Sequence, residues 1–410
     1  MDSNVLFFLI IIILIVQYLI DTALDYLNTK NFLKDVPEEL YDVFDGDEYQ
    51  KARNYHQENY RFGLLKDLFS LITVLLFLGF GGFRLIDDIA IGFSDHAIVQ
   101  ALVFFGLLSL GSALISLPFS YLHTFTIEEK YGFNKTTPSI FFSDMIKSTM
   151  LAIVLGGGII AMVIWFLIWA GGQFWWYVWL AVTVLMLFMN LFYSKLVVPL
   201  FNKQTPLPSG SLKTAIESYA KKVGFDLKNI FVIDGSKRST KANAYFSGFG
   251  RQKRVTLFDT LINDLNEEEI IAVLAHEVGH YKRRHIIFNM ISSVLLTGFM
   301  LFLLSLFVNN PDLSFALGVS RPSYHAALLA FILLYSPIST ITGLAMNYLS
   351  RKFEFEADAY AKDSFAADPL ITSLKKLSKN NLSNLTPHKA YVFVHYSHPP
   401  LIERIRALKT

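Results

Sequence analysis

The most constraining feature of this sequence is a series of long apolar runs that contain few charged residues. Charged residues make up only 17% of the 410 residues and apolar residues 53%, whereas a soluble domain carries about 25% charged residues. A membrane-spanning helix needs about 20 mostly apolar residues. Seven runs meet this requirement: Val5–Leu24, Leu64–Phe83, Ile98–Phe119, Met145–Ala170, Phe174–Leu196, Ile286–Val308 and Ala326–Tyr348. The sequence therefore predicts a mostly α-helical protein with seven transmembrane helices and the lipid bilayer as a partner.

The composition also excludes several classes of function. The chain has no cysteine, which rules out disulfides, thiolate metal sites and cysteine nucleophiles. Its net charge of +2 gives no electrostatic reason to expect a nucleic-acid partner. The first apolar run is preceded by Asp2 rather than by a basic residue and is followed by Asp21 and Asp25. It is therefore expected to be a permanent anchor rather than a cleaved signal peptide.

The distribution of Lys and Arg predicts the orientation in the membrane. Seven crossings place the two termini on opposite sides. One set of connecting segments contains only two cations, Arg84 and Arg321; these segments are 1–4, 84–97, 171–173 and 309–325. Nearly all other cations fall in 25–63, 120–144, 197–285 and 349–410. By the positive-inside rule the second set is cytoplasmic, so the N-terminus is expected outside and the C-terminus inside.

A short motif in the hydrophilic segment 197–285 is typical of a metal-binding site. It reads His276-Glu277-Val278-Gly279-His280. Histidines four residues apart lie on one face of a helix, so both imidazoles can reach one ion. The acidic stretch 267–269 followed by apolar residues is typical of a helix start. The pattern is that of HExxH zinc hydrolases, in which the glutamate accepts a proton from the attacking water.

A catalytic zinc site also needs a third protein ligand. The metzincin pattern is excluded because Arg283 and Ile286 stand where it requires Gly and His. His285 lies five residues beyond His280, which is about 140° around a continuous helix and a poor position for a ligand. Since cysteine is absent, the third ligand is expected to be a carboxylate or a distant histidine.

The segment 350–360 supplies candidate carboxylates on the same side of the membrane, because two predicted spans separate it from the HExxH motif. Glu354 and Asp358 are four residues apart and share one helix face, whereas Glu356 points elsewhere. The spacing favours Glu354 as a ligand and Asp358 as the partner of a ligating histidine. The alternative is a charged helix at the membrane surface.

Several motifs in one order resemble the type I CAAX prenyl proteases, which are seven-span zinc metalloproteases that cleave prenylated peptides. They are IEEKYGFNK at 127–135, PLFNKQTPLPSG at 199–210, NAYFSGFGRQKRVTLFDTLI at 243–262, HEVGH at 276–280, RKFEFEADAYAK at 351–362 and SHPPLIERIRAL at 397–408. The resemblance covers nearly the whole chain. It implies one zinc ion per chain, a peptide or protein substrate of the kind that can carry a prenyl group, and a water-filled chamber enclosed by the spans.

The resemblance also assigns residues. It places the metal ligands on His276, His280 and Glu354, and the catalytic glutamate on Glu277. The acidic residue of the E-x-x-A-D pattern falls on Asp358. The remaining family positions fall on Asn243, for substrate binding, and on His398.

For Asn243 and His398, the surrounding sequence also allows simpler explanations than the roles that the family implies. The run Val255–Phe258 is typical of a strand, and an exposed strand edge near Asn243 could bind a peptide backbone or be only the edge of a small sheet. His398 precedes two prolines and could donate to an oxyanion, although a lone histidine is more often a surface or packing residue.

Together these observations predict a zincin-like protease domain with a small β-sheet on the cytoplasmic face. The expected divisions are 1–198 with five spans, 199–285 with the HExxH helix, 286–348 with two spans, and 349–410 with the third ligand. The chain ends in Ala407-Leu408-Lys409-Thr410, without a dilysine retrieval signal. This ending favours a bacterial cytoplasmic membrane over the endoplasmic reticulum.

Three other functions compete with this interpretation. One is a quality-control protease of broad specificity that cleaves misfolded membrane proteins. Another is a non-catalytic seven-span transporter or receptor in which HExxH is accidental. An intramembrane protease is disfavoured because the motif is followed by YKRRH, which belongs at a surface.

Overall fold

The computed structural model places a long helix over each predicted span, although the helix of the second span ends at Gly79, four residues before the predicted end at Phe83. It describes residues 2–32, 36, 38–43, 46–225, 227, 229–247 and 254–410. The long helices are α1 (Ser3–Asn31), α2 (Gly46–Gly79), α4 (Ala97–Leu122), α5 (Pro138–Ala170), α6 (Phe174–Leu196), α11 (His285–Phe307) and α13 (Tyr324–Ser364). Six helical stretches of the described chain are long and apolar enough to cross a membrane, and one of them, Pro138–Phe201, contains α5 and α6 in succession. The molecule is a multi-pass membrane protein.

Two of the long helices continue well beyond their apolar runs. The helix α2 begins at Gly46, within the acidic segment that precedes its span. The helix α13 runs for 41 residues, which is about 60 Å at 1.5 Å per residue and twice the thickness of the hydrocarbon core. Its last part, beyond Tyr348, is rich in Glu, Lys and Ala, which favour helix. As a result α13 carries Glu354 and Asp358 into the predicted protease domain without a break.

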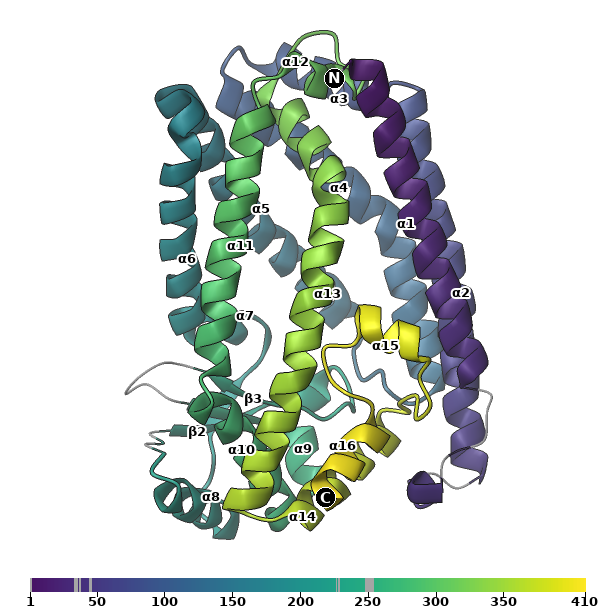
Figure 1. The fold of residues 1–410 in the computed structure, drawn as a ribbon, viewed down its shortest axis with the longest axis vertical. Coiled ribbons are helices and arrows are strands. Elements are labelled where there is room, and N and C mark those ends of the chain that lie inside the picture. Colours follow the sequence, from purple (N-terminus) through teal and green to yellow (C-terminus); the bar gives the residue numbers. More distant parts are fainter. Residues whose placement is uncertain are drawn as a thin grey trace.

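The two ends of the molecule differ in structure (Figure 1). One end holds the N-terminus and the short helices α3 (Gly82–Phe93) and α12 (Pro311–Phe315). The other end holds the C-terminus and the protease domain. Its helices are α7 (Val198–Phe201), α8 (Ser211–Lys222), α9 (Asp259–Asp264), α10 (Glu267–Lys282), α14 (Ala367–Asn380), α15 (Lys389–His395) and α16 (Leu401–Lys409). The termini therefore lie at opposite ends of the bundle, as an odd number of crossings requires.

Four short segments with tighter or wider helical turns connect these elements. They are η1 (Glu38–Leu40), η2 (His123–Glu128, a π-helix), η3 (Gly171–Gln173) and η4 (Gly235–Lys237). The turn η3 links α5 directly to α6, and this explains why both helices belong to one continuous apolar stretch.

The predicted small β-sheet is present and has four strands in the order β1-β2-β4-β3. They are β1 (Gln204–Pro206), β2 (Asn229–Ile233), β3 (Ala244–Ser247) and β4 (Arg254–Phe258). The strand β4 pairs in parallel with β2 and antiparallel with β3. The strand predicted at 255–258 is therefore confirmed but lies inside the sheet. The two edge strands are β1 and β3, and β3 begins next to Asn243.

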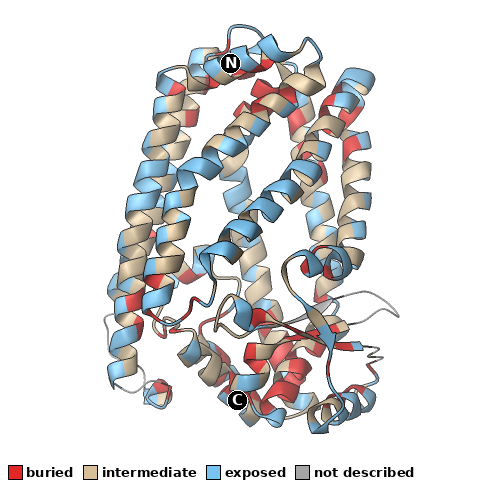
Figure 2. Cartoon of the chain, turned by 180° about the vertical axis from the view of Figure 1, so that it is seen from behind, coloured by how far each residue is buried: buried red, intermediate tan, exposed pale blue. Residues whose placement is uncertain are grey.

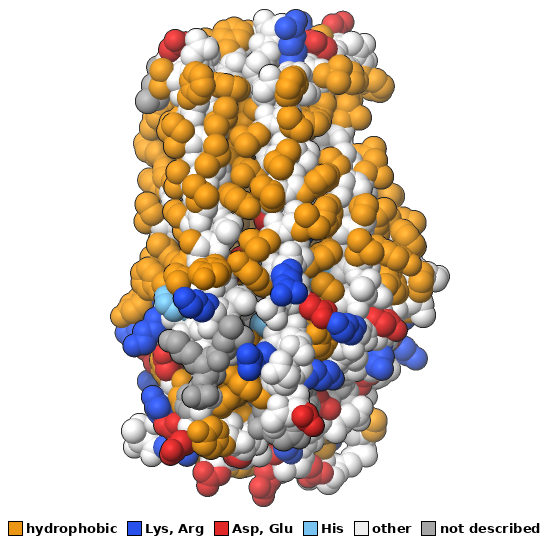
Figure 3. Space-filling view, turned by 90° about the vertical axis from the view of Figure 1, so that its right-hand side faces the viewer, with side chains coloured by type: hydrophobic (Ala, Val, Ile, Leu, Met, Phe, Trp, Pro, Cys, Tyr) orange, Lys and Arg blue, Asp and Glu red, His pale blue; other side chains and the backbone are white. Residues whose placement is uncertain are grey.

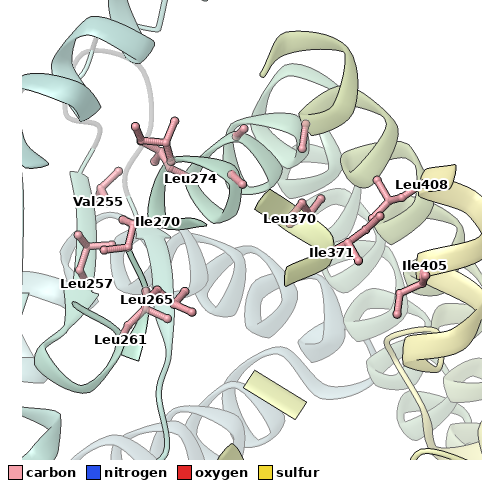
Figure 4. Close-up of a cluster of buried hydrophobic side chains, with 14 of the residues drawn as sticks. Val255, Leu257, Leu261, Leu265, Ile270, Leu274, Leu370, Ile371, Ile405 and Leu408 are labelled. Atoms are coloured by element: carbon pink, nitrogen blue, oxygen red, sulfur yellow. The ribbon is translucent and has the colours of Figure 1, made fainter. Parts of the chain in front are cut away.

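Burial is concentrated at the two ends of the molecule (Figure 2). At the protease end, Val255 and Leu257 of β4 pack with Ile270 and Leu274 of α10 in one core, which α14 and α16 continue (Figure 4). The long helices between the ends are mostly unburied, with 6% to 22% of each apolar window inside the protein. Hydrophobic side chains cover the long upper part of the surface, and charged ones gather around the protease domain (Figure 3). This pattern fits a belt of lipid around the helices.

Candidate metal centre

The helix that carries the HExxH motif is held firmly at its start. The side chain of Asn266 accepts a hydrogen bond from the backbone N–H of Glu269, and the Glu269 carboxylate accepts one from the Asn266 N–H, both at 2.9 Å. This reciprocal capping satisfies two backbone donors that a helix start leaves free. Glu269 is buried and also pairs with Lys376 of α14 at 2.8 Å. The acidic residues seen in the sequence thus fix the position of α10.

Small residues bring α10 and α13 into close contact. A Cβ atom added to Gly279 would lie 3.0 Å from both Cα and O of Ala357, which is tighter than most Cβ contacts in proteins. Ala275 and Ala357 are completely buried. The glycine inside HEVGH therefore allows the two helices to pack closely without displacing the α13 backbone, and this packing places the motif against Glu354 and Asp358.

Three side chains from these two helices converge on one point. His276, His280 and Glu354 each offer a ligand atom, and the three atoms lie within 4.8 Å of one another. The two Nε2 atoms are 3.1 Å apart, and each lies 3.3 Å from an oxygen of the Glu354 carboxylate. Two imidazoles and one carboxylate are a ligand set that catalytic zinc sites use.

The donor atoms also fit a metal ion electrostatically. The Oε2 atom of Glu354 is buried and accepts no well-aligned hydrogen bond within the described part of the chain, although Nε2 of His276 lies 3.3 Å and Nη1 of Arg404 3.7 Å away; a lone pair is thus left for a metal ion. Burial raises the pKa of Glu354, but the neighbouring His276, His280 and Arg404 outweigh it and hold the pKa well below its usual range. Glu354 is therefore ionised, as a ligand must be.

A buried ion pair supports His276 from behind. Its Nδ1 lies 2.8 Å from Oδ1 of Asp358, which leaves Nε2 directed at Glu354 and His280. Arg404 of α16 donates to both oxygens of Asp358, at 2.8 Å from Nε and 2.6 Å from Nη2. Such a carboxylate partner fixes the orientation and tautomer of a ligating histidine.

The carboxylates around His276 also control its charge. Burial acts to lower its pKa, but hydrogen bonds with Asp358 and Glu354 outweigh burial and raise the pKa to about 9. A histidine must lose its proton to bind a metal ion through Nε2 when Nδ1 faces a carboxylate. Metal binding at this centre is therefore coupled to proton release.

Glu277 lies next to this cluster but does not belong to it. The three residues that can share an ion are the neighbouring histidines and Glu354. Burial raises the pKa of Glu277, and the nearby His276 and His280 oppose this effect. A half-buried carboxylate with a raised pKa has the property needed to accept and return a proton.

The helix does not continue to His285, so the predicted reason for rejecting that residue was wrong. The helix α10 ends at Lys282, and α11 begins at His285 after Arg284, whose φ is 62°. The Nδ1 atom of His285 lies 3.0 Å from Nδ1 of His280, and its Nε2 lies 3.0 Å from Glu356. His285 therefore contacts the back of His280 rather than the site of convergence, and Glu356 points to His285 rather than to the site.

The structure brings His398 to the cluster and places Asn243 at the edge of the β-sheet. His398 lies in the loop between α15 and α16, is exposed, and has its Nε2 3.3 Å from Oε1 of Glu354. Asn243 lies in the exposed position just before the edge strand β3 and accepts a hydrogen bond from the Ala244 N–H at 2.8 Å. Proximity to Glu354 distinguishes His398 from an ordinary surface histidine.

The sequence motifs did not predict the contacts that two residues, Arg404 and His285, make at the centre. Arg404 contacts Asp358 and also lies 3.7 Å from Glu354. It lies in a C-terminal amphipathic helix, and the one available signal was a cation on its apolar face between Leu401 and Leu408. His285 had been considered only as a ligand and not as the partner of His280.

Comparison with known proteins gives matches over nearly the whole chain. Residues 25–203 match the family model "CAAX prenyl protease N-terminal, five membrane helices", and residues 206–410 match "Peptidase family M48". The CAAX prenyl protease 1 of Saccharomyces cerevisiae is 37% identical over 400 residues, covering 91% of this chain and 88% of the yeast protein. The mouse CAAX prenyl protease 1 homolog is 35% identical, with the same two coverages. The crystal structure of S. mikatae Ste24p superposes with a TM-score of 0.92 at 36% identity and 98% coverage of both chains.

Proposed function

Since the chain belongs to the type I CAAX prenyl protease family and is a zinc metallopeptidase of family M48, we propose that it hydrolyses prenylated CAAX-type peptides. In this proposal one zinc ion per chain is held by His276, His280 and Glu354. The observation that carries it is the convergence of these three side chains within 4.8 Å beside Glu277. The buried Oε2 of Glu354, which accepts no hydrogen bond within the described part of the chain, supports the same assignment.

The chemistry follows from the residues around the convergence point. Zinc, when bound, polarises the scissile carbonyl and lowers the pKa of water. Glu277 accepts the proton of the attacking water and passes it to the leaving amine. Asp358 and Arg404 hold His276 in the orientation that directs Nε2 forward. His398, on the open side of Glu354, donates to the oxyanion that develops on the substrate.

The substrate backbone has a natural place to bind. The strand β3 lies at the edge of the sheet, and Asn243 stands immediately before it. An extended peptide can add to such an edge through backbone hydrogen bonds. We assign Asn243 to the positioning of this peptide.

A cavity next to the sheet supports a substrate that carries a lipid. It has a volume of about 1080 Å³ and lies between α6, α11 and the strands β2 and β4. Methionines line it, namely Met186, Met189 and Met290. Their flexible side chains adapt to apolar groups of irregular shape.

The proposed orientation places the protease domain in the cytoplasm and the N-terminus outside. The cation distribution supports this assignment. Because the chain has no cysteine, single cysteines can report it without background. Ser209 and Ser320 are exposed and lie on segments expected on opposite sides. Ser209→Cys should react with an impermeant reagent only from the cytoplasmic side and Ser320→Cys only from outside, and labelling of both from one side would refute the proposal.

The decisive experiment compares two peptides of one sequence, prenylated and unprenylated, with protein whose metal content has been measured. We expect about one zinc per chain, loss of activity on chelation, recovery on addition of zinc, and a clear preference for the prenylated peptide. Equal cleavage of both peptides would contradict the CAAX-type substrate and would point to a quality-control protease. Full activity after complete removal of zinc would contradict the assigned metal centre.

A further inference from the structure

A basic recess lies where the protease domain meets the membrane helices. It has a volume of about 750 Å³. Its cations come from five separate elements of the chain: Lys147 of α5, Lys195 of α6, Lys203 just after α7, Lys237 of η4 and Arg254 of β4. Folding, rather than a single charged loop, gathers these charges. A general preference for cations on the cytoplasmic side of spans does not by itself place them around one recess.

The nearby carboxylates are already engaged in the fold. Asp234, which lines the recess, accepts hydrogen bonds from the Lys203 backbone N–H at 2.8 Å and from Asn202 at 3.1 Å. Asp144 pairs with Arg238 through two hydrogen bonds of 2.6 and 2.9 Å. Within the described part of the chain, Lys147, Lys203 and Lys237 form no direct ion pair, although Lys147 and Lys237 act electrostatically on Asp144. Five cations and one carboxylate, Asp234, line the recess, and this excess of positive charge favours an anion.

The surface beside the recess is apolar and unpaired. Ile146, next to Lys147, is 60% exposed, and Leu196, next to Lys195, is 52% exposed. Leu200 lines the recess itself, is 48% exposed, and accepts a hydrogen bond from Lys147 through its carbonyl. Ile146 lies near the start of the span in α5, Leu196 is the last residue of α6, and Leu200 lies in α7, which follows α6 after one residue. Exposed apolar side chains beside a cluster of cations at the ends of membrane helices suit a phospholipid, with its phosphate in the recess and its acyl chains along α5 and α6.

From this juxtaposition we propose that the recess binds the phosphate headgroup of an anionic membrane phospholipid. Basic pockets between membrane helices on the cytoplasmic side are suited to such headgroups. Lysine ammonium groups bind phosphate as point charges with little demand on geometry, so the recess selects for charge and for position in the membrane. The bound lipid joins α5, α6 and the sheet across the membrane boundary. It leaves the metal centre, which lies between α10 and α13, unchanged.

Three charges can be removed without touching the metal centre. The test variant is Lys147→Gln/Lys203→Gln/Lys237→Gln. The matched control is Lys213→Gln/Lys221→Gln/Lys409→Gln, which removes the same charge from α8 and α16 at the far side of the protease domain. Each juxtamembrane cation strengthens binding to an anionic surface by about fivefold. The test variant should therefore bind phosphatidylglycerol roughly 100-fold more weakly, and the control should bind it like the unmodified protein.

Native mass spectrometry of the full chain, titrated with phosphatidylglycerol or phosphatidylcholine, measures this directly. We expect saturable binding of phosphatidylglycerol alone, lost in the test variant, with zinc content equal in all three proteins. Equal binding by test and control variants would overturn the proposal. Displacement of the lipid by millimolar inorganic phosphate would show that free phosphate is the ligand and would also overturn it. Should the triple variant fail to fold, Lys237→Gln alone, at an exposed position, must still weaken binding about fivefold.

Discussion

Two buried histidine–aspartate pairs lie at opposite ends of the molecule, and both involve α13. At the protease end, His276 lies 2.8 Å from Asp358. At the other end, His325 in the first turn of α13 lies 2.6 Å from Asp87 of α3. All four side chains are almost completely inaccessible to water. The two pairs are alike in residue type and distance, so their surroundings decide what each can do.

The surroundings differ in the atoms that face each histidine. His276 uses Nδ1 for its aspartate and directs Nε2 toward a second histidine and a second carboxylate, and Arg404 balances the charge of Asp358. His325 uses Nε2 for Asp87, and its ring packs on Phe104 at 4.6 Å. A pair becomes a metal site only when the second ring nitrogen faces converging ligands. The far pair instead joins α3 to α13.

The largest expected effect comes from removing the third ligand. Glu354→Ala should lose zinc and all peptidase activity, because two histidines alone do not complete the ligand set. Glu356→Ala is the matched control on the same helix, and it should retain most of both because Glu356 is not a ligand and reaches the centre only through His285, which contacts the back of His280. Zinc per chain by elemental analysis and peptide turnover are the measurements. Loss of zinc in Glu356→Ala with retention in Glu354→Ala would reverse the assigned faces of α13.

The second prediction separates chemistry from metal binding. Glu277→Gln keeps the shape of the side chain but cannot carry a proton. Turnover should fall by about 10²–10⁴-fold while zinc content and peptide affinity stay unchanged. If the Glu277→Gln variant remained substantially active, another group would have to be the general base. A variant that also lacks zinc would contradict the placement of Glu277 outside the ligand set.

The third prediction concerns the support of His276. Asp358→Asn removes the charge that orients the ring and accepts two hydrogen bonds from Arg404. Loss of such a partner typically weakens metal affinity by about 10–100-fold. Zinc affinity measured with a competing chelator should fall by this factor. Unchanged affinity would mean that Arg404 and Asp358 serve only to dock α16.

The smallest effect is expected at the far pair. Asp87→Asn should leave zinc affinity and turnover unchanged, in contrast to Asp358→Asn. It weakens the bond between α3 and α13 and should lower stability by about 1–3 kcal/mol, the cost of disturbing a buried hydrogen bond. Thermal unfolding in detergent measures this. A change in zinc affinity would show that the two ends are coupled through α13 and would break the comparison.

Much of the molecule could be predicted from local patterns. Each predicted span is a helix because a run of about 20 apolar residues has to bury its backbone in lipid, and a helix satisfies every backbone group within the segment. The i, i+4 spacing brought His276 and His280 to one face, and it did the same for Glu354 and Asp358. The prediction that failed locally is the continuity of α10 through Arg284, whose left-handed backbone carries no signal comparable to a glycine or a proline.

The helical membrane architecture, the HExxH face of α10 and the preference for Glu354 over Glu356 follow from periodicity and apolar length, which act between neighbours in the chain. Which distant groups meet depends instead on how whole helices and loops pack. Arg404 reaches Asp358 from another helix, His398 approaches Glu354 from a loop, and His325 finds Asp87 across 238 positions of sequence. These contacts depend on the packing of whole elements, in which Gly279 against Ala357 sets the distance between helices, and no local pattern encodes that distance.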